Sequence, residues 1–115
     1  MFETNDFKTS KGLVDALVRR QGVLSNNLTN IGVKGYVRQD IDFNRVLSDL
    51  KNNNSFDQDN GSVLSKAQYQ DHSKPMTLES EMSKLYDNYL RYLLLVKSIG
   101  HHFEHMKKAL EVRAS

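Results

Sequence analysis

The 115-residue chain contains no cysteine, no tryptophan and a single proline. Without cysteine it can form neither a disulfide framework nor a zinc site with thiolate ligands. Long hydrophobic runs are also missing. The longest, Tyr92 to Val96, falls far short of the roughly 20 residues that cross a bilayer. The formal charge of +2 is close to balance, so it gives no electrostatic reason to expect nucleic acid or a membrane surface as a partner.

The residues that are present divide unevenly along the chain. Its length allows one domain at most, and only 38% of the residues are hydrophobic. These residues gather towards the two ends, whereas the middle is polar. A small chain buries a modest fraction of its surface. We therefore expect the best apolar surface of this chain to be buried against other molecules.

The last third of the chain, residues 76–115, is predicted to form one long helix. A repeat of 3.5 residues keeps one seam of a helix facing a partner helix. Thr77 is expected to cap the helix, and Glu79 and Glu81 place negative charge in its first turn, where the helix dipole favours it. The apolar heptad stripe consists of Leu78, Met82, Leu85, Tyr89, Tyr92, Val96, Ile99, Phe103, Met106 and Leu110.

A first helix is predicted from about Lys8 to Asn30, within an N-terminal segment 1–35. Gly12 and Gly22 each weaken it by up to about 1 kcal/mol relative to alanine. Its apolar residues, spaced at multiples of three and four, are Phe7, Val14, Leu17, Leu24, Leu28 and Ile31. The predicted fold class is mainly α, with two long antiparallel terminal helices forming a coiled coil around a polar, partly extended middle insertion.

The insertion, residues 36–75, is predicted to be mostly extended or irregular. Alternation of apolar and polar residues over Val37 to Phe43 predicts a strand, with Asp40 and Asp42 on its exposed side. A short amphipathic helix is predicted over 43–50. The polar composition from Lys51 to Ser62 predicts a loop, and a short strand is predicted over Val63 to Gln70.

The long helix has more apolar surface than one partner can cover. Between Tyr86 and Val96 it is apolar around most of its circumference, because Tyr86, Leu90, Leu93, Leu94 and Leu95 stand beside the stripe. Leaving one leucine exposed forgoes roughly 1.5–3 kcal/mol of hydrophobic stabilisation. We expect other subunits to cover this second side. The alternative is that the 43–50 helix folds over it.

No catalytic or cofactor site is predicted. The chain has no nucleophile motif and no phosphate-binding glycine loop. His101 and His105 share one helical face, but two imidazoles alone make a weak metal site, so no metal is expected and a solvated or interface role is favoured. Tyr86, Tyr89 and Tyr92 are interpreted as packing residues rather than a binding platform. The basic residues of the first helix are diluted by acidic ones, which argues against nucleic acid.

Several short motifs resemble those of one protein family. The stretch 20–30, Arg-Gln-Gly-Val-Leu-Ser-Asn-Asn-Leu-Thr-Asn, resembles the Ser-Asn-Asn-Ile-Ala-Asn signature of bacterial flagellar axial proteins. Gly35-Tyr36 and the stretch 38–43 resemble the Pro-Gly-Tyr and Asp-Val/Ile-Asp-Phe patterns of proximal-rod subunits, with Val33-Lys34 standing where that family has Thr-Pro. The stretches 81–84 and 88–92 match the C-terminal pattern of the same subunits, so the resemblance spans about two-thirds of the chain.

The resemblance implies a structural role. Flagellar rod proteins build the hollow, torque-transmitting rod of the basal body, which crosses the periplasm, and their terminal helices pair into coiled coils that pack helically. The implied partners are further copies of the chain, other rod proteins, and a small adaptor protein that links the rod to the membrane ring and export gate. The resemblance also implies type III export, which agrees with the lack of a recognisable cleaved signal peptide. The alternative is a soluble coiled-coil adaptor or regulator that binds a partner helix.

Asn26, Asn27 and Asn30 are expected to make interhelical or inter-subunit hydrogen bonds that fix register, with ordinary capping of a helix end as the alternative. The full set expected to make inter-subunit or packing contacts is Leu17, Leu24, Asn26, Asn27, Leu28, Asn30, Tyr36, Leu85, Tyr89, Leu90, Tyr92, Leu93, Leu94, Val96, Ile99 and Phe103.

Overall fold

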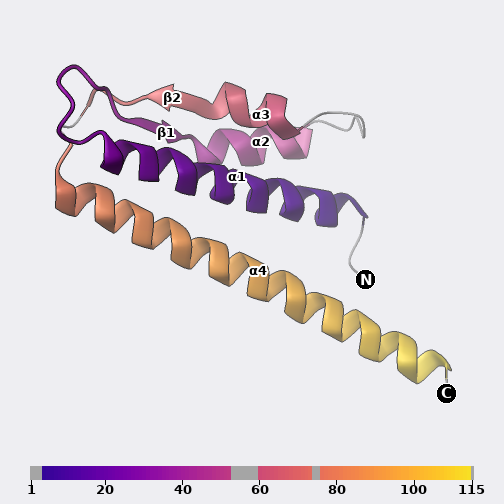
Figure 1. Ribbon diagram of the computed structural model, residues 1–115. Helices are drawn as coiled ribbons and strands as arrows, with labels where there is room; N and C mark the ends of the chain where they lie inside the picture. Colours follow the sequence, from indigo (N-terminus) through magenta and orange to yellow (C-terminus); the bar gives the residue numbers. More distant parts are fainter. Residues whose placement is uncertain (1–3, 53–59, 74–75, 115) are drawn as a thin grey trace.

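A computed structural model describes residues 4–52, 60–73 and 76–114. This part of the chain is mainly helical, as predicted, and forms an elongated body of 65 × 29 × 17 Å (Figure 1). In chain order the elements are α1 (Thr4–Thr29), β1 (Gln39–Ile41), α2 (Phe43–Asn52), α3 (Asn60–Ala67), β2 (Gln68–Gln70) and α4 (Leu78–Ala114).

Helix α1 lies in the middle of the molecule. Helix α4 packs along one side of it and runs in the opposite direction, while α2, α3 and the two strands cover the other side (Figure 1). At 37 residues, α4 is much longer than α1, which has 26, and it continues past the N-terminal end of α1 (Figure 1). The distal turns of α4 therefore have no neighbouring element among the described residues.

The apolar core lies between α1 and the smaller elements rather than between α1 and α4. Leu13, Val23, Phe43 and Leu50 pack around it. The buried residues that form the core are Ala16, Ile41, Val46, Val63, Leu64 and Ala67. One face of α1 is thus used for a small globular core, and its other face is left for α4.

The strand predicted over Val37 to Phe43 is confirmed over Gln39–Ile41 only, as β1, and Phe43 begins α2. Strand β1 pairs antiparallel with β2 in the register Gln39↔Gln70, Asp40↔Tyr69 and Ile41↔Gln68. The helix predicted over 43–50 is confirmed as α2. The strand predicted over Val63 to Gln70 is wrong for its first five residues, which are helical in α3. That helix places Val63, Leu64 and Ala67 in the core, and burial outweighs the weak helix propensity of its glycine and serines.

The loop predicted from Lys51 to Ser62 is wrong at both ends. Lys51 and Asn52 complete α2, and the last three residues of that stretch begin α3; residues 53–59 lie outside the described residues. The prediction followed polar composition alone, which cannot reveal that an adjoining helix will continue for another turn.

Helix α4 begins as its sequence predicts. The Oγ1 of Thr77 accepts a hydrogen bond of 3.1 Å from the backbone N–H of Ser80, so Thr77 is the N-cap. Helix α1 begins four residues before the predicted Lys8 and ends at Thr29, one residue before the predicted Asn30. Among the described residues, no helix combines the length and hydropathy that a membrane span requires.

Candidate assembly surface

The face of α4 that lies against α1 differs from the predicted seam. Glu81 and Asn88, seven residues apart, are fully buried there, and Leu85 and Tyr92 between and after them are half-buried. From Leu85 onward, therefore, only every second residue of the predicted stripe is half-buried. Its other members are 40 to 60% exposed; these are Leu78, Met82, Tyr89, Val96, Phe103 and Leu110. The apolar pattern could not reveal that a glutamate and an asparagine occupy the inward positions.

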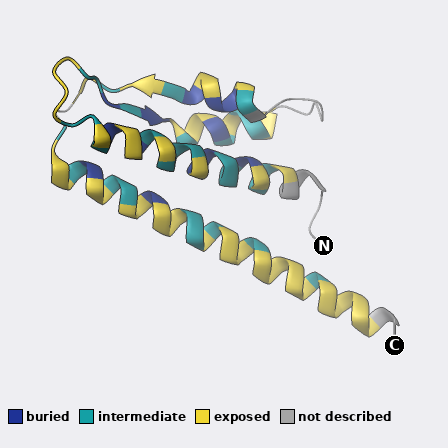
Figure 2. Cartoon of the chain, viewed as in Figure 1, coloured by how far each residue is buried: buried dark blue, intermediate teal, exposed yellow. Residues whose placement is uncertain are grey.

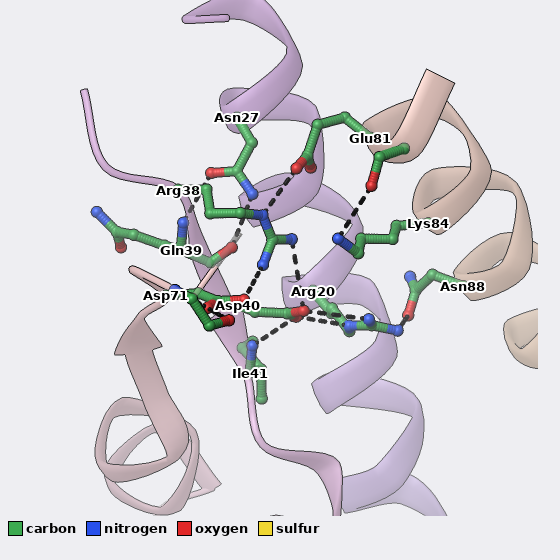
Figure 3. A network of polar contacts seen from close by, with 12 residues as sticks. Arg20, Asn27, Arg38, Gln39, Asp40, Ile41, Asp71, Glu81, Lys84 and Asn88 are labelled. Atoms are coloured by element: carbon green, nitrogen blue, oxygen red, sulfur yellow. Dashed lines mark hydrogen bonds and ion pairs between the residues drawn. The ribbon is translucent and has the colours of Figure 1, made fainter. Parts of the chain in front are cut away.

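Glu81 faces inward because it pairs with the buried guanidinium of Arg38, the residue just before β1. Nε of Arg38 donates to Oε1 of Glu81 at 2.7 Å, and its Nη1 donates to Oδ2 of Asp71 at 2.6 Å (Figure 3). Nη2 of Arg38 lies 3.6 Å from a carboxylate oxygen of Asp40. Burial by itself would lower the pKa of Arg38, but Glu81, Asp40 and Asp71 raise the pKa overall. The guanidinium is therefore charged. It links Glu81 of α4 to Asp40 of β1 and to Asp71, the residue that follows β2.

Asn88 is held by hydrogen bonds with residues of α1. Arg20 of α1 donates to both carboxylate oxygens of Asp40, at 2.7 and 3.2 Å, and its Nη1 donates to Oδ1 of Asn88 at 3.4 Å (Figure 3). The Nδ2 of Asn88 donates in turn to the backbone oxygen of Leu17 and to the side chain of Gln21. Asp40 is thus buried and paired, and the expectation of an exposed carboxylate there is wrong.

This polar cluster consists of Arg20, Arg38, Asp40, Asp71, Glu81 and Asn88. Within the described chain, Nη2 of Arg38 and Oε2 of Glu81 are buried without a hydrogen bond. Buried ion pairs with incomplete hydrogen bonding add little net stability compared with an apolar contact, but they strongly disfavour other arrangements. We expect the polar cluster to fix the register of α4 on α1, because other registers would leave its charges buried without partners.

The asparagines near the end of α1 bond within the chain. The side chain of Asn27, fully buried, accepts from the N–H of Gln39 at 2.9 Å and donates to its carbonyl at 2.7 Å, as a neighbouring strand would. The hydroxyl of Tyr36 donates to Oδ1 of Asn27 and accepts from Asn26. Asn30 donates to the carbonyl of Asn26, which is a local capping bond. An additional inter-subunit role of these residues stays a prediction.

The turn that follows α1 contains Gly35 at a φ of +83°, a backbone conformation that side chains disfavour. This turn forms with Val33-Lys34 in place of Thr-Pro, and the N–H of Tyr36 bonds to the carbonyl of Val33 at 3.2 Å. The glycine, rather than a proline, therefore sets the chain reversal that delivers Tyr36 to the asparagines.

A groove runs between α1 and α4. It has a volume of about 440 Å³. Asn88 and Gln21 line it and hydrogen-bond to each other at 2.8 Å. Gly22 also lines the groove, and a Cβ there would meet nothing within 4 Å. The residues that line the groove are Leu17, Val18, Gln21, Gly22, Ser25, Asn88, Tyr89 and Tyr92.

Apolar side chains on the outer side of α4 are exposed, and no other element among the described residues covers them. Tyr86, Leu90 and Leu94, each one turn after the last, are 65, 41 and 69% exposed. We call these three residues the ridge. Figure 2 shows that exposed residues dominate α4 along most of its length, in contrast to α1. Helix α2 packs on α1 and α3, so the alternative that the 43–50 helix covers the ridge is wrong.

The remaining residues that were predicted to make contacts range from buried to exposed. Leu17 and Leu24 are buried; Leu28, Leu93 and Ile99 are half-buried; Val96 and Phe103 are exposed. His101 and His105 are exposed, with rings stacked at a centroid distance of 5.9 Å. Within the described ranges, no group of three or more His, Cys, Asp or Glu side chains is placed to hold a metal ion.

The polar cluster was not predicted from the sequence, although all of its members except Asp71 lie in the motifs quoted above. Glu81 and Asn88 stand seven residues apart, which is the spacing of a heptad seam, and this was the available signal. Arg38 and Asp40 carried no comparable signal, because their partners are distant in sequence. No protein-family model matches the chain, and comparison with curated protein sequences gives no significant match.

Proposed function

We propose that this chain is a structural subunit of the proximal rod of the bacterial flagellar basal body. Copies would pack helically, with other rod proteins, into the hollow shaft that transmits torque and lets exported proteins pass. The observation that carries this proposal is the ridge of α4, an apolar surface that no element of the described chain covers. The motif resemblance supplies the identity of the assembly.

The energetic argument begins with the exposed side chains. Each leucine left in water forgoes roughly 1.5–3 kcal/mol, so several of them together approach the whole stability of about 5–15 kcal/mol of a small domain. Exposed apolar patches on a protein surface often mark sites of contact with other proteins. Neighbouring subunits in a rod would cover it, and many such contacts along interlocked helices would resist the shear that torque produces.

The arrangement of α1 and α4 also supports the proposal. The two helices lie side by side in opposite directions, which is the arrangement expected of a pair that completes a coiled coil within the rod. The buried Glu81 and Asn88 would hold their register during assembly, since a polar residue at a seam position disfavours slipped alternatives. In this proposal the chain is exported to the periplasmic rod without a cleaved signal peptide, and it contacts a small adaptor protein at the base.

The test is made in the bacterium that encodes the chain. A strain that lacks the chain should be non-motile, and a plasmid copy should restore motility. The double variant Leu90→Asp/Leu94→Asp should fail to restore it, because two buried carboxylates between subunits would prevent rod assembly. Export should persist, and is measured as subunit secreted by a strain arrested before rod completion.

The matched control is Ser98→Asp, which adds a carboxylate one turn beyond Leu94 at an exposed position of the same helix. This variant should restore motility to at least half the wild-type swimming rate. Normal motility of the double variant, or of the strain that lacks the chain, would contradict the proposal.

A soluble coiled-coil adaptor is the second candidate, and one observation favours it. Helix α1 contributes Ala16, Leu17 and Leu24 to the buried interior of a single chain, so the chain has a core without neighbours. An adaptor should form a stable small oligomer in dilute solution, whereas a rod subunit should order α1 fully only in the polymer. Circular dichroism and sedimentation of the purified chain separate the two candidates.

A further inference from the structure

We propose that α4 opens away from the rest of the chain as one unit, while α1, α2, α3 and the two strands stay folded around their core. The inference concerns the single chain and does not depend on what the chain assembles with. It goes beyond the proposed function, because it assigns a conformational change to the contact between α1 and α4.

The apolar core is complete without α4. Every buried residue of the core, and every half-buried residue that packs around it, lies between Leu13 and Ala67. The elements that supply these residues lie together on one side of the molecule, with α1 at their edge and α4 beyond it (Figure 1). Departure of α4 therefore takes no side chain out of the core.

The buried residues of α4 are polar. Among the described side chains of this helix, only Glu81 and Asn88 are buried. The apolar side chains that α4 places towards α1, such as Leu85 and Tyr92, are half-buried. Burial of apolar surface is the main favourable contribution to folding, so each residue of α4 gains less from its contact than each residue of the core.

The polar contacts between α4 and the rest of the chain add little to that gain. Glu81 pairs with Arg38, and Asn88 hydrogen-bonds with Arg20. When α4 opens, water hydrates both members of each pair, so no charge is left buried alone and the net loss is small. Within the described chain, Nη2 of Arg38 and Oε2 of Glu81 are buried without a hydrogen bond in the closed form, and both gain water on opening.

Helix α4 can open without unfolding. It has 37 residues, well above the roughly 12–15 residues below which isolated helices are marginal. It carries its own N-cap, Thr77, and an ion pair between Asp87 and Arg91 at 3.0 Å along its surface. Proteins open in cooperative units whose free energies lie below that of global unfolding, and α4 has the properties of such a unit.

Opening of α4 exposes an apolar strip of α1 that consists of Leu17 and Leu24. The backbone oxygen of Leu17 accepts a hydrogen bond from Asn88 of α4 at 2.9 Å. Leu24 lies on the same face of α1, because seven residues make nearly two helical turns. Both leucines are buried, and neither belongs to the core. Access to a side chain at position 24 therefore reports whether α4 is open.

The experiment uses the absence of cysteine from the chain. Leu24→Cys places one thiol under α4 and Val46→Cys places one in the core, at side chains that are both 0% exposed. Each purified variant reacts with a thiol reagent in native buffer, where a rate proportional to reagent concentration measures the fraction of open molecules. Urea denaturation gives the globally unfolded fraction of the same variant. We expect Leu24→Cys to react at least tenfold faster than that fraction allows, and Val46→Cys to react at the rate that fraction sets.

A second substitution in each chain separates the two openings. Val63→Ala weakens the core, which the closed and open forms share. It should therefore raise the reaction rate of Val46→Cys at least tenfold and leave that of Leu24→Cys within about twofold. Glu81→Gln weakens the closed form alone and should raise both rates by the same factor. Ile41→Val makes the core test, with at least a threefold rise for Val46→Cys, if Val63→Ala does not fold.

Equal rises for both thiols in the Val63→Ala chains would mean that α4 leaves only when the core unfolds, and this result overturns the inference. Reaction of Val46→Cys faster than global unfolding allows would mean that the core opens by itself, which also overturns it. Unprotected reaction of both thiols would show that a single chain forms no core, with the same consequence. None of these rates bears on motility, so the inference and the rod function can fail separately.

Discussion

Nε of Arg38 donates a 2.7 Å hydrogen bond to Oε1 of Glu81, across 43 residues of chain, with both side chains buried. This ion pair joins the strand region to the long helix at its first turn. Asp71 completes the arrangement from the segment that follows β2. The position of α4, and with it the direction in which the ridge faces, depends on this contact.

Replacement of Glu81 by alanine should lower the free energy of unfolding by about 3–5 kcal/mol, because Arg38 would remain buried with a reduced counter-charge. The loss is measured by urea denaturation. Glu81→Gln keeps a hydrogen-bond acceptor, so its free energy of unfolding should fall by less. This variant replaces the alanine variant in the test if the alanine variant does not fold.

The control is Glu79→Ala, which removes the same charge from the first turn of α4 at an exposed position. Only its interaction with the helix dipole is lost, worth about 0.3–1 kcal/mol. If the two alanine variants lost the same free energy of unfolding, the buried pair of Glu81 with Arg38 would contribute no more to stability than an exposed glutamate.

Asn26 and Asn27 are adjacent in the motif and should respond differently to alanine. Asn27→Ala should lower the free energy of unfolding by about 2–4 kcal/mol, since two bonds to the backbone of Gln39 disappear inside the protein. Asn26→Ala, at an exposed position, should change it by less than about 1 kcal/mol.

Hydrogen exchange locates the effect of Asn27. The amide proton of Gln39 should exchange faster in Asn27→Ala by at least tenfold, because its acceptor is lost. Protection that is unchanged at Gln39 would mean that another group accepts this bond, and the structural role given to Asn27 would fail.

Asp71 should make stability depend on pH in acid. Hydrogen bonds from the side chain and backbone of Ser73 lower its pKa to about 2, with further help from Arg38. The unfolded chain binds this proton at about pH 4, near the usual aspartate value. The carboxylate therefore stabilises the native state above about pH 4, and this contribution is lost as the pH falls from about 4 to about 2.

The test compares the wild-type chain with Asp71→Asn by urea denaturation over this range. The difference in unfolding free energy should be constant above pH 5 and shrink as the pH falls towards 2. Ser73→Ala should raise the pKa of Asp71 towards its usual value in an NMR titration. A difference that stays constant down to pH 2 would contradict the assignment.

Gly22 and Gly12 offer a matched pair within α1. Gly22→Ala should raise the free energy of unfolding by about 0.5–1 kcal/mol, because alanine favours the helix and its Cβ meets open space. At Gly12 a Cβ would approach Cδ1 of Leu50 to 2.6 Å, so that side chain must move and the gain should be smaller or reversed. Thermal denaturation of the two variants decides this, and a larger gain at Gly12 would contradict the packing of α2 on α1.

Much of the architecture could be predicted because it depends on local chemistry. The range of α1, the cap at Thr77 and the strand around Asp40 follow from periodicity, capping and alternation, which neighbouring residues specify. Helix α3 could not be predicted in this way. Its residues have weak helix propensity, and only the core that Val63 and Leu64 enter favours the helix.

The sequence by itself determined that the chain is mostly helical, that α4 is long, and that its apolar side chains outnumber those one partner helix can cover. Only the tertiary structure decided which of them face α1. Arg38 pairs with Glu81, and Arg20 and Leu17 of α1 hydrogen-bond to Asn88, so both side chains face inward and Leu90 and Leu94 face outward. A charge buried without a partner costs more than an exposed leucine, so pairs distant in sequence set the rotation of the helix.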